Sequence, residues 1–90
     1  MRRAAKVDAN QPAIVTALRK AGATVQQLKG VGDSCPDLLI GYRTRNFLLE
    51  IKQPGEQLRP GQRKWIDVWR GQACVAYSAE EALRIIGAVR

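Results

Sequence analysis

Apolar and polar positions alternate along the chain in seven short segments, each with the period of a helix or a strand. They predict a helix at 8–21, strands at 23–28, 36–42 and 45–52, a helix at about 60–70, a strand at 73–78 and a helix at 79–89. No repeat or linker-like segment interrupts this pattern. Residues 1–90 are therefore expected to form one α/β domain of order α-β-β-β-α-β-α, with a central mixed sheet flanked by helices.

The first and last predicted helices carry boundary signals. Apolar residues spaced i, i+1, i+4 and i+7 from Ile14 form one stripe, and Asp8 or Asn10 can cap the helix that contains them. Ser78 can cap the last helix, where Glu81 completes a capping box three residues later.

The predicted strand at 45–52 ends on two charged residues. Because side chains alternate along a strand, Glu50 and Lys52 share one face with Leu48, and the odd-numbered apolar residues from 47 to 51 share the other face. The basic turn "RTRN" joins this strand to the one before it and predicts a hairpin. Asp37 begins the first strand of that hairpin, so it is expected to lie near Glu50 and Lys52.

Two explanations fit these charges at the edge of a sheet. In the structural explanation, Lys52 neutralises one acid in a buried or half-buried salt bridge, which leaves the second acid unexplained. In the functional explanation, the two carboxylates and a main-chain carbonyl bind a hard divalent ion such as Mg²⁺, whose coordination is completed by water. A lysine beside such an ion can orient or activate an attacking water and stabilise charge on a phosphate.

Composition narrows the possible partners and chemistry. The chain has 15 Lys or Arg residues against 8 Asp or Glu, a net charge of +7, which favours nucleic acid as partner, with an acidic membrane surface second. It has no histidine, the commonest general base, so catalysis would need carboxylates, lysine or a bound metal. Two cysteines without histidine argue against a structural zinc site.

The distribution of apolar residues indicates a cytoplasmic protein. No apolar run approaches the roughly 18 residues of a membrane span. The amino-terminal segment is basic but lacks the apolar region of a signal peptide. Cys35 and Cys74 are accordingly expected to be reduced thiols.

Short motifs in the hairpin and after it resemble those of a nuclease family. "PD" at 36–37 and "EIK" at 50–52 resemble the PD-(D/E)xK nuclease signature. From about 30 to 87 the chain further resembles the virus-type replication-repair nuclease domain, VRR-NUC, in its stand-alone phage or bacterial type. The pattern E-I-K-x-P-G-x-x-L-x-x-x-Q, from 50 to 62, agrees with that family in residue type and spacing. The resemblance implies a small restriction-endonuclease-like fold.

The resemblance also implies roles for individual residues. Asp37 and Glu50 would bind Mg²⁺ or Mn²⁺ together with the carbonyl of Ile51. Lys52 would be the catalytic lysine, and Gln62 would be the active-site glutamine on the helix after the loop. The products would be a 5′-phosphate and a 3′-hydroxyl.

The spacing of residues in the predicted helix at 60–70 places Gln62 on its inward face, independently of the family resemblance. Gln62, Trp65, Ile66 and Trp69 are spaced i, i+3, i+4 and i+7, so all four are expected to face inward. A buried glutamine needs a hydrogen-bond partner, which is either the active site or a loop backbone group. The two tryptophans are interpreted as core or dimer contacts rather than as platforms for stacked bases.

The chain departs from the family in its first helix. Family members often carry a glutamate there that contributes to the metal site, and this helix has none. Asp8 is the nearest acid, and Asn10 or Gln11 stands where an acid is expected. Whether Asp8 or Gln11 contributes to the site, and whether one or two ions bind, is left open at this stage.

These features together predict a metal-dependent, structure-selective DNA endonuclease. The resemblance implies Holliday-junction-like branched DNA as substrate, a homodimer, and a bacterial or phage-infected cell as its setting. Possible phosphate contacts are Arg43, Arg45, Arg59, Arg63 and Lys64, although each can equally be a solvated surface charge.

One alternative function is a non-catalytic DNA-binding module that retains the fold. Another is a basic RNA-binding domain, which would need exposed aromatic residues on a central strand, where only Phe47 is placed.

Overall fold

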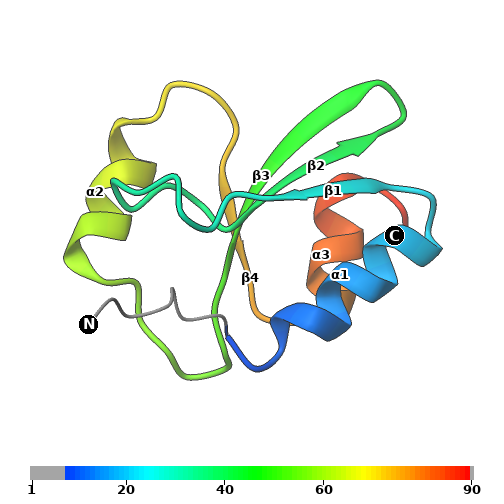
Figure 1. Cartoon of the computed structure of the whole chain (residues 1–90), viewed down its shortest axis with the longest axis horizontal. Coiled ribbons are helices and arrows are strands. Elements are labelled where there is room, and N and C mark those ends of the chain that lie inside the picture. Colours follow the sequence, from blue (N-terminus) through cyan, green and yellow to red (C-terminus); the bar gives the residue numbers. More distant parts are fainter. Residues whose placement is uncertain (1–7, 90) are drawn as a thin grey trace.

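The computed structural model describes residues 8–89, which form helices and a four-stranded sheet (Figure 1). The elements are α1 (Gln11–Lys20), β1 (Thr24–Gln27), β2 (Leu38–Tyr42), β3 (Arg45–Ile51), α2 (Pro60–Val68), β4 (Cys74–Ala76) and α3 (Ala79–Ile86). The α/β class and the predicted order are confirmed, and each element is shorter than the range that the pattern predicted. Residues 1–7 lie outside the described residues. The prediction that the amino-terminal segment is not a signal peptide rests mainly on them.

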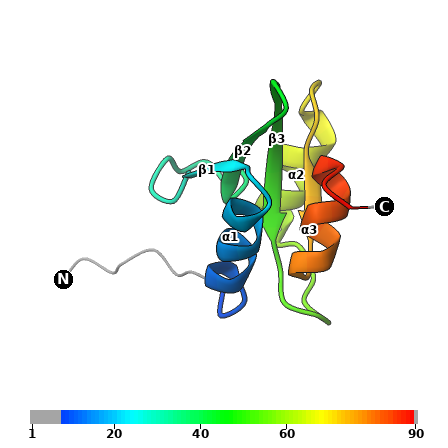
Figure 2. The ribbon, with the colours of Figure 1, turned by 90° about the vertical axis from the view of Figure 1, so that its right-hand side faces the viewer.

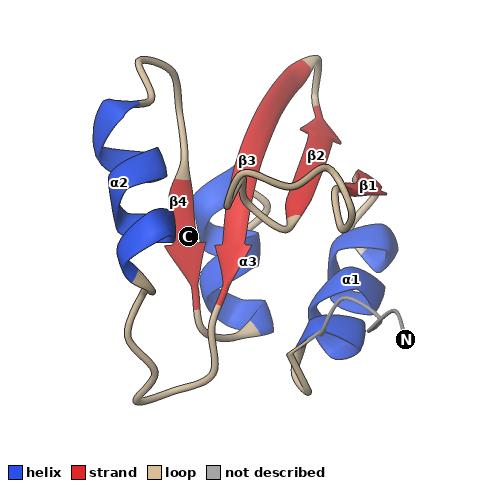
Figure 3. Cartoon of the chain, turned by 60° about the vertical axis from the view of Figure 1, so that its left-hand side comes forward, coloured by secondary structure: helices blue, strands red, loops and turns tan. Residues whose placement is uncertain are grey.

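The sheet has the order β1-β2-β3-β4 and is mixed, as predicted (Figure 3). β1 pairs antiparallel with β2, and β2 pairs antiparallel with β3, whereas β4 pairs parallel with β3. A parallel neighbour needs a crossover connection, and α2 is part of the crossover here. β3 therefore lies between an antiparallel and a parallel neighbour in the middle of the sheet.

One face of the sheet carries the hydrophobic core. It is covered by α1 and α3, which pack against each other (Figure 2). The buried apolar residues of this core are Ile14, Val15, Leu18, Ala23, Leu38, Ile40, Phe47, Leu49, Ile51, Ala76, Ala82 and Ile86. In β3 these are the odd-numbered residues, so the predicted alternation is confirmed. Glu50 and Lys52 consequently belong to the opposite face.

α2 lies across the strands from α1 and α3 (Figure 1) and contributes no apolar residue to the core. Its buried residue is Gln62, whereas Trp65 is half-buried and Trp69 is 46% exposed. The two indole rings stack on each other, with centroids 4.5 Å apart. The prediction that this helix face turns inward is therefore right for Gln62 and wrong for Trp69, because α2 meets the sheet near its own first turn.

The predicted hairpin is confirmed, and its turn is tight. Tyr42 pairs with Arg45, so the turn consists of Arg43 and Thr44, with φ of 50° and 65°. A two-residue turn with both φ values positive matches strand twist but strains residues other than glycine. The Arg43 guanidinium lies 5.2 Å from the ring centre of Tyr42, and that of Arg45 lies 5.5 Å from the ring centre of Phe47.

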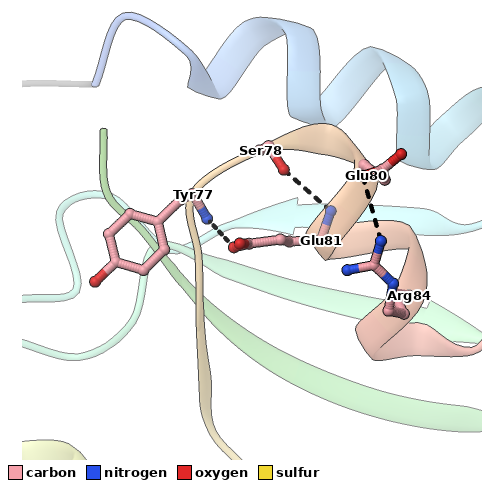
Figure 4. Close-up of polar contacts among 5 residues, drawn as sticks. All are labelled: Tyr77, Ser78, Glu80, Glu81 and Arg84. Atoms are coloured by element: carbon pink, nitrogen blue, oxygen red, sulfur yellow. Dashed lines mark hydrogen bonds and ion pairs between the residues drawn. The ribbon is translucent and has the colours of Figure 1, made fainter. Parts of the chain in front are cut away.

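The start of α3 is fixed by side-chain caps (Figure 4). The Ser78 hydroxyl accepts a hydrogen bond from the Glu81 N–H at 3.1 Å, which confirms the predicted cap. The Glu81 carboxylate accepts from the N–H of Tyr77 at 2.8 Å, one residue before the capping residue. One turn of helix is also spanned by an ion pair between Arg84 and Glu80 at 3.3 Å. The two hydrogen bonds hold the short turn between β4 and α3.

Candidate active site

The hairpin brings the predicted acids to one end of the sheet. Leu38 lies opposite Leu49, so Asp37 lies beside Glu50 at the start of β2 and the end of β3. Together with Lys52 they open into a cavity of about 260 Å³. The cavity is lined by Asp8, Asp37, Glu50, Lys52, Gln53, Glu56, Arg59 and Gln62. It lies on the sheet face opposite the core, between the end of β3 and the start of α2.

The Pro-Asp pair ends the hydrogen-bond ladder between β2 and β3 with a side-chain bond and leaves one main-chain carbonyl without its ladder partner. The Asp37 carboxylate accepts a hydrogen bond from the Ile51 N–H at 2.7 Å. Continuing the register would put Pro36 opposite Ile51, and proline has no N–H to donate to the Ile51 carbonyl. The N–H and carbonyl of a strand residue point the same way, so this carbonyl is directed towards the Asp37 side of β3. It is thus placed to be a third oxygen donor.

Gln62 joins the cavity to the start of α2. Its side-chain Nε2 donates to the Glu50 carboxylate at 2.9 Å, and its Oε1 accepts from the Arg59 N–H at 2.9 Å. The two partners considered from the sequence, an active-site group and a loop backbone group, are both present. One buried amide therefore fixes a cavity carboxylate relative to the helix.

Burial dominates the electrostatics of the two acids. Burial and, after it, the neighbouring charge of Asp37 raise the pKa of Glu50, Lys52 lowers it, and the net result is a pKa of about 8. Burial likewise raises the pKa of Asp37, although the Ile51 N–H lowers it. Two carboxyl groups in one desolvated cavity cannot both ionise freely. The cavity thus disfavours a second negative charge and favours a cation.

Lys52 is 6% exposed, and within residues 8–89 it forms no ion pair. Its charge nevertheless lowers the pKa of both acids. Its main chain is held from two sides: the N–H donates to the Ala76 carbonyl at 3.1 Å, and the carbonyl accepts from the Asn10 amide at 3.1 Å. The described contacts therefore do not match the salt-bridge explanation, and they leave the ammonium group available to a ligand.

The segment before α1 contributes in a way that the sequence did not indicate. Asp8 lines the cavity, whereas Gln11 is buried beside a separate hollow on α1. The Asn10 amide donates to the carbonyls of Lys52 and Tyr77, at 3.1 and 3.2 Å, instead of capping the helix. An asparagine at a helix start reads as a cap, so its bridge between the ends of β3 and β4 carries no signal in the sequence.

The five basic residues proposed to contact phosphate do not form one patch. Arg59 lines the cavity. Arg63 and Lys64 are exposed on α2, where Arg63 pairs with Asp67 at 3.5 Å. The two arginines of the hairpin, 43 and 45, lie at the other end of β3, roughly 15–20 Å from the acids at about 3.3 Å per residue. Arg59 is thus the member of the five that stands at the acids.

The loop before Asp37 packs against the first turn of α2. Asp33 and Ser34 take the left-handed conformation, with φ of 58° and 62°. A Cβ atom at Gly61 would lie 2.7 Å from the Ser34 hydroxyl, so a larger residue there would force that hydroxyl to move. The loop before Asp37 thus lies close to the helix start that carries Gln62.

Cys35, which precedes the Pro-Asp motif, does not offer a second chemistry. Cys35 and Cys74 are free thiols. Burial raises the pKa of Cys35, and the charges of Glu50 and Asp37 raise it further, so it stays protonated at neutral pH. A protonated thiol is a poor nucleophile.

The donor set suits a single hard ion. Within residues 8–89, no three Cys, His, Asp or Glu side chains come together as a metal cluster. Asp37 and Glu50 offer carboxylate oxygens, and the Ile51 carbonyl offers a third. Mg²⁺ in proteins is commonly held by one or two carboxylates and keeps several waters. The residues present therefore fit one such ion better than a two-metal site.

The family model of the VRR-NUC domain matches residues 3–81, which include every residue of the cavity. The chain belongs to the VRR-NUC family. VRR-NUC domains are nuclease domains, so membership makes this chain a nuclease-family protein with DNA as its partner. Asp37 of its Pro-Asp motif and Glu50 and Lys52 of its Glu-Ile-Lys motif line the cavity at the end of the sheet.

The VRR-NUC fold is shown by structure as well. A solved structure described as "VRR_NUC domain" has a TM-score of 0.70 and 22% identity, covering 84% of this chain and 88% of that one. At this identity the similarity shows a shared fold. No curated protein matched the chain. None of the helices within residues 8–89 has the length and apolar character needed to cross a lipid bilayer.

Proposed function

We propose that this VRR-NUC chain is a metal-dependent DNA endonuclease whose active site is the cavity at the end of β3. The observation that carries the proposal is the pair Asp37 and Glu50 in one cavity with Lys52, which is buried and has no ion pair within residues 8–89. Buried charged groups without close partners reduce stability. A site for a cation and a phosphate explains why the sequence keeps them.

Phosphodiester hydrolysis needs a water nucleophile, in-line geometry and stabilisation of growing negative charge. Mg²⁺ or Mn²⁺ held by Asp37, Glu50 and the Ile51 carbonyl would supply Lewis-acid polarisation of the phosphate. The Lys52 ammonium orients the attacking water and stabilises charge on the phosphate oxygens. The products in this fold are a 5′-phosphate and a 3′-hydroxyl.

The remaining polar contacts position these groups before substrate arrives. The Ile51 N–H fixes the Asp37 carboxylate, and Gln62 fixes Glu50. Asn10 fixes the main chain at Lys52. Groups held in place in this way need little reorganisation during the reaction, which is where electrostatic catalysis gains most.

Two other functions have less support. A non-catalytic DNA-binding module would not need Asp37, Glu50 and Lys52 together in one cavity. An RNA-binding sheet would present aromatic side chains to solvent. Phe47, the aromatic residue of β3, is 9% exposed and belongs to the core instead.

For the substrate we propose branched DNA, bound by a homodimer. An apolar hollow of about 420 Å³ lies beside Leu39, Leu48 and Trp69, of which Leu39 and Trp69 are 36% and 46% exposed. Exposed apolar surface of this kind marks interaction sites. Because side chains alternate, Leu39 and Leu48 share a sheet face with Asp37 and Glu50. A second copy seated there would present two active sites on related faces, which suits the near two-fold symmetry of a four-way junction.

The nuclease proposal is tested by cleavage of a four-way junction and of linear duplex of equal length. We expect cleavage with Mg²⁺ or Mn²⁺, none with EDTA, and faster cleavage of the junction. Binding should weaken steeply with salt, since a chain of charge +7 releases counterions from DNA. Tight binding without cleavage under any metal condition would support the non-catalytic module instead.

The dimer proposal is tested by Trp69→Glu. We expect the wild type to sediment as a dimer at micromolar concentration and the variant as a monomer, because a charge buried in an apolar contact costs several kcal/mol. Val89→Glu is the control, since Val89 is 43% exposed and stands beyond α3, on the helix layer that covers the other sheet face. A monomeric wild type would remove the dimer and leave the active-site proposal intact.

A further inference from the structure

Arg59 occupies a position that its residue type does not suit. It is the residue that precedes α2, where Ser, Thr, Asp or Asn is favoured because the side chain can accept a hydrogen bond from the first turn. A guanidinium has only donors, and the Arg59 side chain makes no capping bond. Departures from local preference concentrate at functional sites. The Arg59 side chain is therefore expected to have a role other than capping.

Its surroundings point to the cavity. Arg59 and Lys52 are the two cationic side chains among the described residues that line it. Arg59 forms no ion pair within residues 8–89, although Glu56 lines the same cavity. The Glu56 carboxylate instead accepts the N–H of Gln53 at 2.7 Å, which braces the loop between β3 and α2. The Arg59 guanidinium is therefore a free donor group beside the candidate metal ligands.

Other arginines of the chain are differently engaged. Arg63 pairs with Asp67, and Arg84 pairs with Glu80. The arginines at the hairpin tip lie over aromatic rings. Arg19 and Arg70 also form no ion pair within residues 8–89, but they do not line the cavity, and this position separates Arg59 from them.

The start of α2 adds to the same field. This nine-residue helix has no acidic residue in its first turn, so the positive end of its dipole is not neutralised there. Lys52, 6% exposed and without an ion pair among the described residues, lines the cavity beside it. Two cations and a helix start thus converge next to two acids that can hold a metal ion.

We propose that the Arg59 guanidinium binds the non-bridging oxygens of a DNA phosphate at the cleaved bond or one nucleotide from it. The inference rests on the proposed function, since it names a substrate contact of the same cavity. A planar guanidinium can hold two phosphate oxygens at once, which a lysine cannot. The hydrogen bonds from the Arg59 N–H to Gln62, and from Gln62 to Glu50, fix this contact relative to a proposed metal ligand.

The substitution Arg59→Ser separates substrate binding from stability. Serine is a good capping residue, so the variant is expected to melt at a higher temperature than the wild type. Its cleavage of unmodified DNA is expected to fall roughly 10- to 100-fold, the effect of losing a bidentate contact. Arg84→Ser is the matched control, because Arg84 is exposed on α3 and the charge change is the same. Wild-type cleavage by Arg59→Ser would overturn the proposal.

The position of the contact is tested with DNA that carries one neutral methylphosphonate at a time around the cut. The wild type and Arg84→Ser should lose cleavage at one particular position. Arg59→Ser should show no further loss there, because the contact is already gone. Additive losses in Arg59→Ser at every position would overturn the proposal.

The same DNA series, bound in EDTA and read by gel shift, keeps the two proposals apart. If the wild type does not cleave, the proposed function fails. The Arg59 contact still stands if Arg59→Ser alone loses the position-specific penalty in binding. It falls if wild type and variant respond alike.

Discussion

Glu50→Gln is expected to lower cleavage by at least ~100-fold while leaving the fold intact. Glutamine is isosteric and can still accept the hydrogen bond that Gln62 donates to position 50. What it loses is the negative charge that would hold Mg²⁺ or Mn²⁺. Asp37→Asn should behave in the same way, since its oxygen can still accept from the Ile51 N–H. Cleavage rates and melting temperatures of the two variants are the measurements.

The same variant has a second expected effect that a misfolded protein would not show. The pKa of Glu50 is raised from 4.5 to about 8 in the folded protein, so folding favours its protonated form. That contribution to stability is present at low pH and is lost as the pH rises through about 8. In EDTA the wild type should therefore melt at a lower temperature near pH 8 than near pH 5. Glu50→Gln should lack the share of this pH dependence that comes from the Glu50 carboxyl.

The size of this effect is measurable, since each kcal/mol lost lowers the melting temperature by roughly 4–8 °C in a domain of this size. Asp67→Asn is the control, because Asp67 is an exposed acid on α2 and lies outside the cavity. Wild-type cleavage by Glu50→Gln would refute its role as metal ligand. An equal pH dependence in wild type and Glu50→Gln would refute its role as the buried titrating group.

Lys52→Met is expected to remove cleavage, again by at least ~100-fold, but to keep metal binding. Methionine preserves most of the buried side-chain volume and removes the ammonium that orients water and stabilises phosphate charge. The two carboxylates and the Ile51 carbonyl remain. Stabilisation by Mn²⁺ should therefore persist in melting curves while cleavage per folded molecule is lost.

The competing role for Lys52 is charge balance between the acids. In that case Lys52→Met would melt at a lower temperature but cleave normally per folded molecule, so activity and folded fraction must be measured on the same sample. Lys20→Met is the control, because Lys20 is exposed at the far end of α1 from the cavity. Loss of both Mn²⁺ stabilisation and cleavage would mean that Lys52 acts on the metal site and not on the chemistry.

Local patterns in the sequence determined the parts of this protein that depend on neighbours along the chain. The alternation in β3 put Glu50 on the face away from the core, and the short basic turn put Asp37 beside it. The period of α2 turned Gln62 inward. The resemblance to the family motifs then suggested that these residues are metal ligands and active-site residues. Such features follow from periods of two and 3.6 residues and from hairpin geometry, which need no knowledge of distant contacts.

The tertiary structure decided what depends on how the elements meet. α2 touches the sheet near its first turn, so Trp69 stays exposed although the helical period groups it with Gln62. The Asn10 side chain bonds Lys52 across 42 positions of sequence. Arg59 lines the same cavity as the acids, while the hairpin arginines lie at the other end of β3. No local period encodes these contacts, because they arise only when helices and strands pack against each other.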